Sequence, residues 1–238
     1  MQPPPRPSGL FGPSPTILIG ALARAYCWIS DQVYLRFAWG FDLLTGVLTL
    51  GRFARWRRSA RAYLPDDQVL DLGCGTGRFL REWPVAARRL VGIDRSAGMA
   101  TAFRQQARRH PHPAQMVRAD ATRLPFRDSS FKAALSTFPT RFLLEPAVLR
   151  EAARVVRCED ERSGRLVVVG LYLTTRAPWL QRIFDALYGA PTTVRQAQVV
   201  ERAAIAGLSV SNGVPTEGLI RPTLHLAQRS QEAEHGVG

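Results

Sequence analysis

Short apolar runs alternate with helical segments over most of the chain. Runs rich in Val, Leu and Ile predict strands at 68–72, 90–93, 115–119, 131–137, 165–171, 208–214 and 219–227. Between them, apolar residues recur at helical spacing at 77–83, 97–109, 145–157, 178–188 and 194–206. This alternation predicts an α/β fold, a doubly wound Rossmann-like sheet with helices on both faces. Only residues 215–218 join the last two strands, which we therefore expect to close the sheet as an antiparallel hairpin.

The chain before the first strand follows a different pattern. Residues 1–15 are rich in proline and predict a disordered tail, and 231–238 predict a flexible one. Helical spacing at 17–37 and 41–63 predicts a helical appendage over 16–64, which would cap a domain formed by 65–230. The apolar stretch 17–29 is interrupted by Arg24 and is shorter than the roughly 20 residues that a transmembrane helix needs.

Charge adds one feature to this picture. The net charge is +13, and Lys132 is the only lysine among 32 basic residues. The arginines of 52–61 form either a solvated helix face or a contact with a membrane surface or an anionic ligand. Three cysteines without C-x-x-C spacing indicate neither a disulfide framework nor a zinc site. We expect a cytoplasmic protein, with peripheral membrane contact as an alternative.

A glycine-rich segment follows the first strand directly. The strand residues VLDL run into a turn formed by Gly73, Cys74, Gly75, Thr76 and Gly77. Glycines let a ligand approach the main chain closely, and the next helix offers its N-terminal amides. Arg78 stands where the dinucleotide fingerprint G-x-G-x-x-G needs its last glycine, and there is no G-K-[ST] of a P-loop. Alone, the segment fits many nucleotide-like ligands.

Three aspartates narrow the choice of ligand, because each lies at the carboxyl end of a predicted strand, the sheet edge where α/β folds bind ligands. A carboxylate at Asp71 would repel a pyrophosphate but suits the ammonium of an amino acid. Asp94 comes 21 positions after Gly73, near the separation at which a carboxylate reaches ribose hydroxyls. Asp120 is placed to accept from the adenine amine, with Ala121 leaving room for the ring. Each acid alone is also a common cap or turn residue.

Together, the glycine segment and the three acids predict S-adenosylmethionine as the cofactor. Its head is cationic and it carries no phosphate, so it suits all four features. Three neighbours of these positions complete the expected cofactor site: Arg95, Met99 and Thr137. Cys74 is expected to act as a small spacer in the loop.

These segments resemble a known family. Residues 69–80 (VLDLGCGTGRFL), 91–99 (VGIDRSAGM) and 119–131 (ADATRLPFRDSSF) are similar to successive motifs of the class I S-adenosylmethionine-dependent methyltransferases, in particular the type 11-like group. The similarity extends over 68–171. It implies a methyltransferase that uses S-adenosylmethionine.

A second resemblance concerns the flanking segments. Residues 41–58 (FDLLTGVLTLGRFARWRR) resemble the helical entry of the ubiquinone/menaquinone biosynthesis C-methyltransferases, and 173–188 resemble their lid region. Lys132, the loop at 138–140 and the polar stretch 158–164 depart from the pattern. These departures leave the cofactor motifs intact and affect the acceptor side.

We expect the acceptor to enter above 136–141, between the N-terminal helices and the segment after 171. The residues expected to contact it are Tyr34, Phe41, Phe138, Arg141 and Trp179. Aromatic residues at this density are also typical of a core. If they do line the entry, they favour a small hydrophobic acceptor, quinone-like or lipid-like, methylated on carbon or oxygen. The histidines at 110, 112 and 225 are not evidently placed to serve as a base, and no metal is expected.

Two rival hypotheses remain. The positive charge would suit an RNA methyltransferase, but the chain lacks both the [DNS]-P-P-[YFW] motif and the Pro-Cys nucleophile of base-modifying enzymes, so nucleic acid is the less expected partner. A non-catalytic cofactor-binding scaffold is the other alternative, against which the intact set of acids argues. The sequence does not indicate an oligomeric state.

Overall fold

The computed structural model describes residues 52–83, 89–109, 112–139, 141–157, 159, 164–213 and 220–229. Within these ranges the strands are β1 (Val69–Leu72), β2 (Val91–Asp94), β3 (Gln115–Arg118), β4 (Ala133–Thr137), β5 (Arg165–Thr175), β6 (Leu208–Asn212) and β7 (Ile220–Arg229). The helices are α3 (Phe53–Arg58), α4 (Arg78–Arg81), α5 (Ala97–Arg109), α6 (Pro146–Val155), α7 (Pro178–Tyr188) and α8 (Thr192–Ile205), with 3-10 turns η1 (Ser59–Tyr63) and η2 (Arg141–Leu144).

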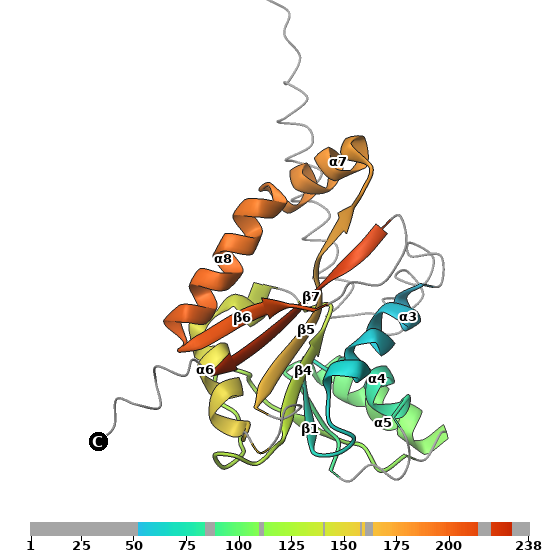
Figure 1. The fold of residues 1–238 in the computed structure, drawn as a ribbon. Helices are drawn as coiled ribbons and strands as arrows, with labels where there is room; N and C mark the ends of the chain where they lie inside the picture. Colours follow the sequence, from blue (N-terminus) through green and yellow to red (C-terminus); the bar gives the residue numbers. More distant parts are fainter. Residues whose placement is uncertain are drawn as a thin grey trace, which may run out of the picture.

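The strands form one sheet in the order β3-β2-β1-β4-β5-β7-β6 (Figure 1). β1 to β5 pair in parallel, whereas β7 is antiparallel to both β5 and β6. The predicted α/β fold and its antiparallel last hairpin are thus confirmed. Because the strand order reverses between β1 and β4, the carboxyl end of β1 lies at the switch point where such sheets bind ligands.

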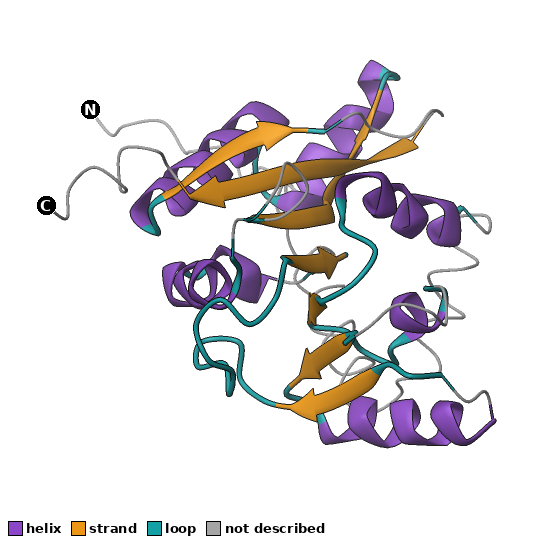
Figure 2. Ribbon diagram, turned by 60° about the horizontal axis from the view of Figure 1, so that its bottom comes forward, coloured by secondary structure: helices purple, strands orange, loops and turns teal. Residues whose placement is uncertain are grey.

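Two apolar layers cover the two faces of the sheet. One contains Leu70 and Leu72 of β1 together with residues of α6 and α8, and the other contains Val69 together with residues of η1, α4 and α5. Neighbouring strand residues point to opposite faces, which explains the split. Figure 1 shows α6 and α8 on one side of the sheet and α4 and α5 on the other, and Figure 2 shows helices on both sides. Asp71 therefore shares the face of Val69, beneath η1 and α4.

Most element bounds agree with the prediction, and the differences have local causes. α5 and α7 have the predicted limits; α7 begins with Pro178 and ends at Gly189, which takes a left-handed conformation. β5 extends to Thr175, beyond the predicted end at 171, because β7 pairs with it past a register shift between Val169 and Leu173. α6 ends at Val155, since Val156 forms a bridge with Phe131.

The N-terminal appendage is described only in part. α3 and η1 lie within the predicted helix over 41–63, while the helix predicted at 17–37 and the tails at 1–15 and 231–238 lie outside the described residues. Across the portion of the chain described above, no helix is long and apolar enough to cross a membrane.

Candidate cofactor and acceptor site

The glycine segment forms a tight turn between β1 and α4. Gly73, Gly75 and Gly77 have φ angles of +73°, +55° and +71°, a region that side chains with a Cβ rarely adopt. The N–H groups of Gly73 and Cys74 both donate to the carbonyl of Ile93 at 2.9 Å, which holds the turn against β2. The three predicted glycines are therefore each required by the backbone conformation of the turn.

Gly77 is also required by close packing. A Cβ added there would lie 2.2 Å from the ring of Phe103, whereas one at Gly75 would meet only the Met99 sulfur, at 3.8 Å. Both Phe103 and Met99 are buried residues of α5. The helix after β2 thus supports the turn from beneath, and Met99, a predicted cofactor residue, belongs to this support.

Asp94 joins the end of β2 to the same turn. Its Oδ2 accepts a hydrogen bond from the Gly75 N–H at 3.1 Å, and its Oδ1 accepts from the Ser96 N–H at 2.8 Å. The residue is buried. Each carboxylate oxygen can accept more than one hydrogen bond, so both bonds are compatible with contact to a ligand hydroxyl.

Asp71 differs from Asp94 because its carboxylate lacks hydrogen bonds. The residue is only 1% exposed, and neither oxygen has a hydrogen-bond partner among the described residues. Burial raises the pKa of Asp71 to about 7, which the positive charge of Arg57 opposes and the negative charge of Asp94 reinforces. A buried polar group without a partner is costly, so this carboxylate suits a cationic ligand group that would bond to it.

Arg57 lies inside the protein, which differs from both alternatives predicted for this run, a solvated helix face and a contact with a membrane surface or an anionic ligand. It is buried, and its Nη2 donates to Glu82 Oε1 at 2.7 Å. The exposed members of the run are Arg52, Arg55 and Arg58. A single arginine among five carries no sequence signal for burial, because its partners Glu82 and Asp71 come from other elements. Arg57, whose charge acts on Asp71, and its partner Glu82 are therefore residues of the candidate site that the sequence did not identify.

Asp120 lies at the same sheet edge but is exposed. Its Oδ1 accepts from both the N–H and the hydroxyl of Thr122 at 2.8 Å. Both hydrogen bonds lower the pKa of Asp120, and the one from the N–H has the larger effect. The parallel register sets Asp94 beside Arg118, two residues before Asp120. The three predicted acids thus lie at one edge of the sheet, and Asp120 is the outermost. Arg95 directly follows Asp94 in the chain, and Ala121 directly follows Asp120.

Cys74 occupies the loop as a small packed residue. Its sulfur would be 2.5 Å from a Cβ at Gly92, and burial raises the pKa of its thiol well above the usual value. A neutral thiol is a poor nucleophile, which agrees with the predicted spacer role. Next to it, the carbonyl of Thr76 accepts from Arg81 Nη1 at 2.6 Å.

The predicted acceptor residues are distributed over separate elements. Phe138 follows Thr137, the last residue of β4, and its ring stacks on Trp56 of α3 with centroids 6.2 Å apart. The same ring covers Gly170, where a Cβ would lie 2.4 Å away. Arg141 begins η2, and Trp179 lies in the first turn of α7, 65% exposed. Tyr34 and Phe41 lie outside the described residues.

Comparison with known proteins gives consistent matches. A family described as a methyltransferase domain matches residues 69–159. A demethylmenaquinone methyltransferase of Mycobacterium marinum is 35% identical over 170 residues, which cover 67% of this chain and 69% of that protein. One of Beutenbergia cavernae is 40% identical over 154 residues, covering 63% and 58%.

Solved structures show the same fold. An S-adenosylmethionine-dependent methyltransferase of Thermotoga maritima, described as a possible histamine N-methyltransferase, superimposes with a TM-score of 0.55 at 18% identity, covering 84% of this chain and 99% of that one. At this identity the likeness concerns the fold alone.

Proposed function

The chain belongs to the family of these demethylmenaquinone methyltransferases, within the class I S-adenosylmethionine-dependent methyltransferases, and we propose that it methylates a ring carbon of a quinone-like acceptor with a hydrophobic tail. It is an S-adenosylmethionine-dependent enzyme; the acceptor is the proposed part. The activity for which these relatives are named is the observation that supports a quinone. Their alignments cover about 60 to 70% of their own length, so the acceptor needs its own test.

The cofactor residues follow from the chemistry of the donor set. Asp71 would hold the ammonium of S-adenosylmethionine, because it is a buried carboxylate that accepts no hydrogen bond from the residues described in the structure. Asp94 would accept from the ribose hydroxyls with its remaining lone pairs, and Asp120 from the adenine amine. When bound, the cofactor supplies a methyl group activated by its positively charged sulfur. The chain's residues then provide orientation and exclude water.

His225 of β7 is not placed to act as a general base. Leu224 packs in the layer of Val69, beneath η1 and α4, so the adjacent His225 points to the opposite face, towards α8. Its Nδ1 lies 3.0 Å from Asn212 Oδ1, and burial lowers its pKa to about 4. We therefore propose that the acceptor enters with an ionised ring hydroxyl, which makes the ring carbon nucleophilic, and that the ring proton is lost to water.

Methyl transfer to defined acceptors tests the proposal. The purified protein is incubated with methyl-labelled S-adenosylmethionine and a reduced, demethylated naphthoquinone that carries a prenyl tail. Equal incubations contain RNA, phospholipid or the quinone's fully methylated form. The proposal predicts label in the demethylated quinone only. Label in RNA or lipid, with none in the quinone, would contradict the quinone proposal and would identify RNA or lipid as the acceptor.

A further inference from the structure

The outer face of α7 exposes large apolar side chains beside arginines. Trp179 is 65% exposed and Ile183 is 47% exposed, and the four-residue spacing places them on one side of the helix. Arg182 is exposed next to them, and Arg176 is exposed just before the helix. The combination of an aromatic, an aliphatic and two cationic residues differs from an ordinary solvated helix face.

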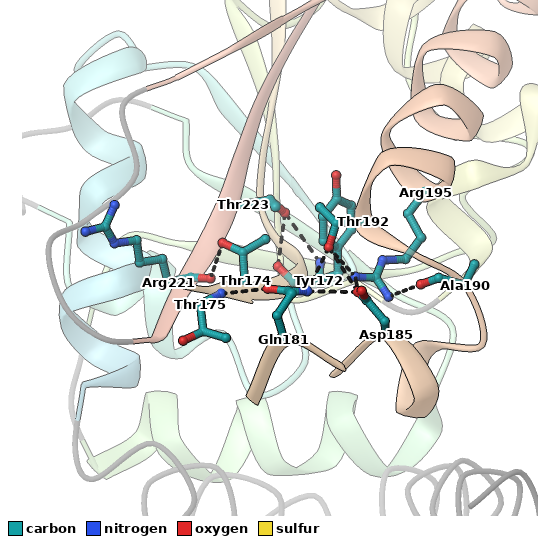
Figure 3. Close-up of polar contacts among 10 residues, drawn as sticks. All are labelled: Tyr172, Thr174, Thr175, Gln181, Asp185, Ala190, Thr192, Arg195, Arg221 and Thr223. Carbon is teal, nitrogen blue, oxygen red and sulfur yellow. Dashed lines mark hydrogen bonds and ion pairs between the residues drawn. The ribbon is translucent and has the colours of Figure 1, made fainter. Parts of the chain in front are cut away.

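The position of α7 is fixed by a polar network on its inner side (Figure 3). Asp185 Oδ1 accepts from Gln181 Nε2 at 2.8 Å, from Thr192 Oγ1 at 3.1 Å and from Arg195 Nη2 at 3.0 Å. Gln181 Oε1 in turn accepts from the Thr175 N–H at 2.9 Å, which ties α7 to the end of β5. The helix is therefore held at both its start and its middle, and the outward direction of Trp179 is set by this network.

Arg195 completes the network from α8. It is buried, its Nη1 donates to the Ala190 carbonyl at 2.7 Å, and its guanidinium lies over the ring of Tyr172 at 4.8 Å from the centroid. The ion pair with Asp185 matters for the outer face, because Asp185 is the only acidic residue of α7. Its carboxylate is turned inward, so the outer face carries positive charge alone.

From these observations we propose that the outer face of α7, formed by Trp179, Arg182 and Ile183, docks on the surface of an anionic lipid bilayer. Tryptophan prefers the headgroup level, an aliphatic side chain enters the acyl boundary, and arginines attract anionic headgroups. The net charge of +13, the exposed Arg52 just before α3 and the exposed Arg55 and Arg58 within α3 act in the same direction. An RNA partner would use the arginines but would leave Ile183 unused.

Docking would bring the acceptor side of the sheet to the membrane. α7 directly follows β5 in the chain, and α3 packs against β5. The apolar face of α7 and the exposed arginines of α3 therefore belong to elements that both contact this strand. A tailed quinone dissolves in the bilayer, so a docked enzyme would meet it there. This consequence rests on the proposed function, whereas the docking itself can be measured without turnover.

Vesicle co-sedimentation tests the docking. The full chain is mixed with vesicles of phosphatidylcholine alone or of phosphatidylcholine with phosphatidylglycerol. Trp179→Ser and Ile183→Ser are compared with Ile205→Ser of α8, a control that is 55% exposed. We expect binding to the anionic vesicles only, reduced at least tenfold by either α7 variant and unchanged by the control. Equal loss in all variants, or no binding by a protein that still binds S-adenosylmethionine, would overturn the proposal.

Charge reversal separates lipid from nucleic acid. Arg182→Glu is compared with Arg202→Glu, an exposed arginine of α8. The α7 change should weaken vesicle binding several-fold more than the α8 change. If RNA retention falls with Arg182→Glu while vesicle binding does not, the face binds nucleic acid and the membrane proposal is wrong.

A last comparison uses activity with two forms of the acceptor. Ile183→Ser should retain the wild-type rate with a short-tailed, water-soluble quinone and lose it several-fold when a long-tailed quinone is supplied in vesicles. Equal loss with both forms would show that α7 serves the acceptor pocket and would overturn docking. If no quinone is methylated while vesicle binding still depends on α7, the proposed acceptor fails and the docking stands.

Discussion

The Asp94 carboxylate accepts the N–H of Gly75 at 3.1 Å, so the end of β2 holds the middle of the glycine turn that follows β1. Its second oxygen accepts the Ser96 N–H. The acid thus shapes the turn through two backbone bonds before any ligand arrives, and we expect it to serve the ribose as well.

Asp94→Asn should reduce both stability and cofactor affinity. A carboxamide has one acceptor oxygen, so one of the two N–H groups would face an NH2 group, at a cost of about 1–3 kcal/mol. Chemical denaturation and calorimetry with S-adenosylmethionine measure the two effects. Asp120→Asn is the matched control for stability, because Oδ1 of Asp120 alone accepts both Thr122 bonds and an amide oxygen can replace it. Equal stability losses in the two variants would contradict this role of Asp94.

Gly77→Ala should damage the turn far more than Gly189→Ala. Both glycines have left-handed φ angles, +71° and +76°, but a Cβ at Gly77 meets Phe103, whereas one at Gly189 meets no described residue within 4 Å. The left-handed conformation alone costs roughly 1–2 kcal/mol, which is the loss expected for Gly189→Ala. Gly77→Ala should lose more and bind S-adenosylmethionine at least tenfold more weakly. Similar thermal shifts for the two variants would show that Phe103 does not constrain the loop.

Arg57→Met should destabilise the protein and weaken cofactor binding. The change removes the shorter of two ion pairs of Glu82, whose side chain is partly exposed and also lies 3.9 Å from Arg78 Nε, so we expect a loss of about 1–3 kcal/mol, below that of a fully buried pair. It also removes the positive charge that lowers the pKa of Asp71, leaving less carboxylate at neutral pH. Arg58→Met, at an exposed position, is the control for denaturation and calorimetry. Wild-type behaviour of Arg57→Met would refute the coupling.

His225 should make the fold sensitive to mild acid. Its pKa in the folded protein, about 4, lies below the ordinary value of 6.5, so between these values the unfolded chain binds a proton that the folded chain does not. Stability from neutral His225 is therefore present above pH 6.5 and is lost as the pH falls towards 4. Denaturation of wild type and His225→Gln across this window measures the difference, which should shrink with falling pH. A constant difference would contradict the burial argument.

The sequence predicted the parts of this structure that depend on local pattern. The limits of α7 follow from Pro178 and Gly189, and the glycine turn follows from its three glycines. The extension of β5 to Thr175 was not predictable, because it depends on pairing with β7 across a bulge. The burial of the Arg57 side chain was likewise not predictable, because its partner Glu82 lies 25 positions away in the chain.

The missing hydrogen bonds of Asp71 also required the structure. The strand pattern placed this acid before the glycine turn, but its lack of partners depends on how η1 and α4 cover the face of β1. The sequence therefore placed the three acids at one sheet edge without showing that, among the described residues, the carboxylate of Asp71 has no hydrogen-bond partner.

If Asp71 holds the ammonium as proposed, its raised pKa should also set the pH dependence of cofactor binding. The pKa of Asp71 is raised from the ordinary 3.8 to about 7 in the folded protein. Below pH 3.8 the carboxyl is protonated in both the folded and the unfolded chain, so its burial does not destabilise the fold through charge. As the pH rises through 7, the buried group must ionise, and the unliganded protein loses stability. Asp71→Asn should therefore stabilise the unliganded protein at pH 8 by on the order of 4 kcal/mol. Affinity of the wild type for S-adenosylmethionine should rise as the pH increases through 7, and that of the variant should not.

The most direct test of the site compares two ligands that differ in the amino-acid tail. Calorimetry measures S-adenosylhomocysteine, which carries the ammonium, and 5′-methylthioadenosine, which lacks it, against the wild type and Asp71→Asn. If Asp71 holds the ammonium, the variant loses at least tenfold in affinity for S-adenosylhomocysteine and keeps its affinity for 5′-methylthioadenosine. An equal loss for both ligands, or no loss for either, would contradict the assignment of Asp71.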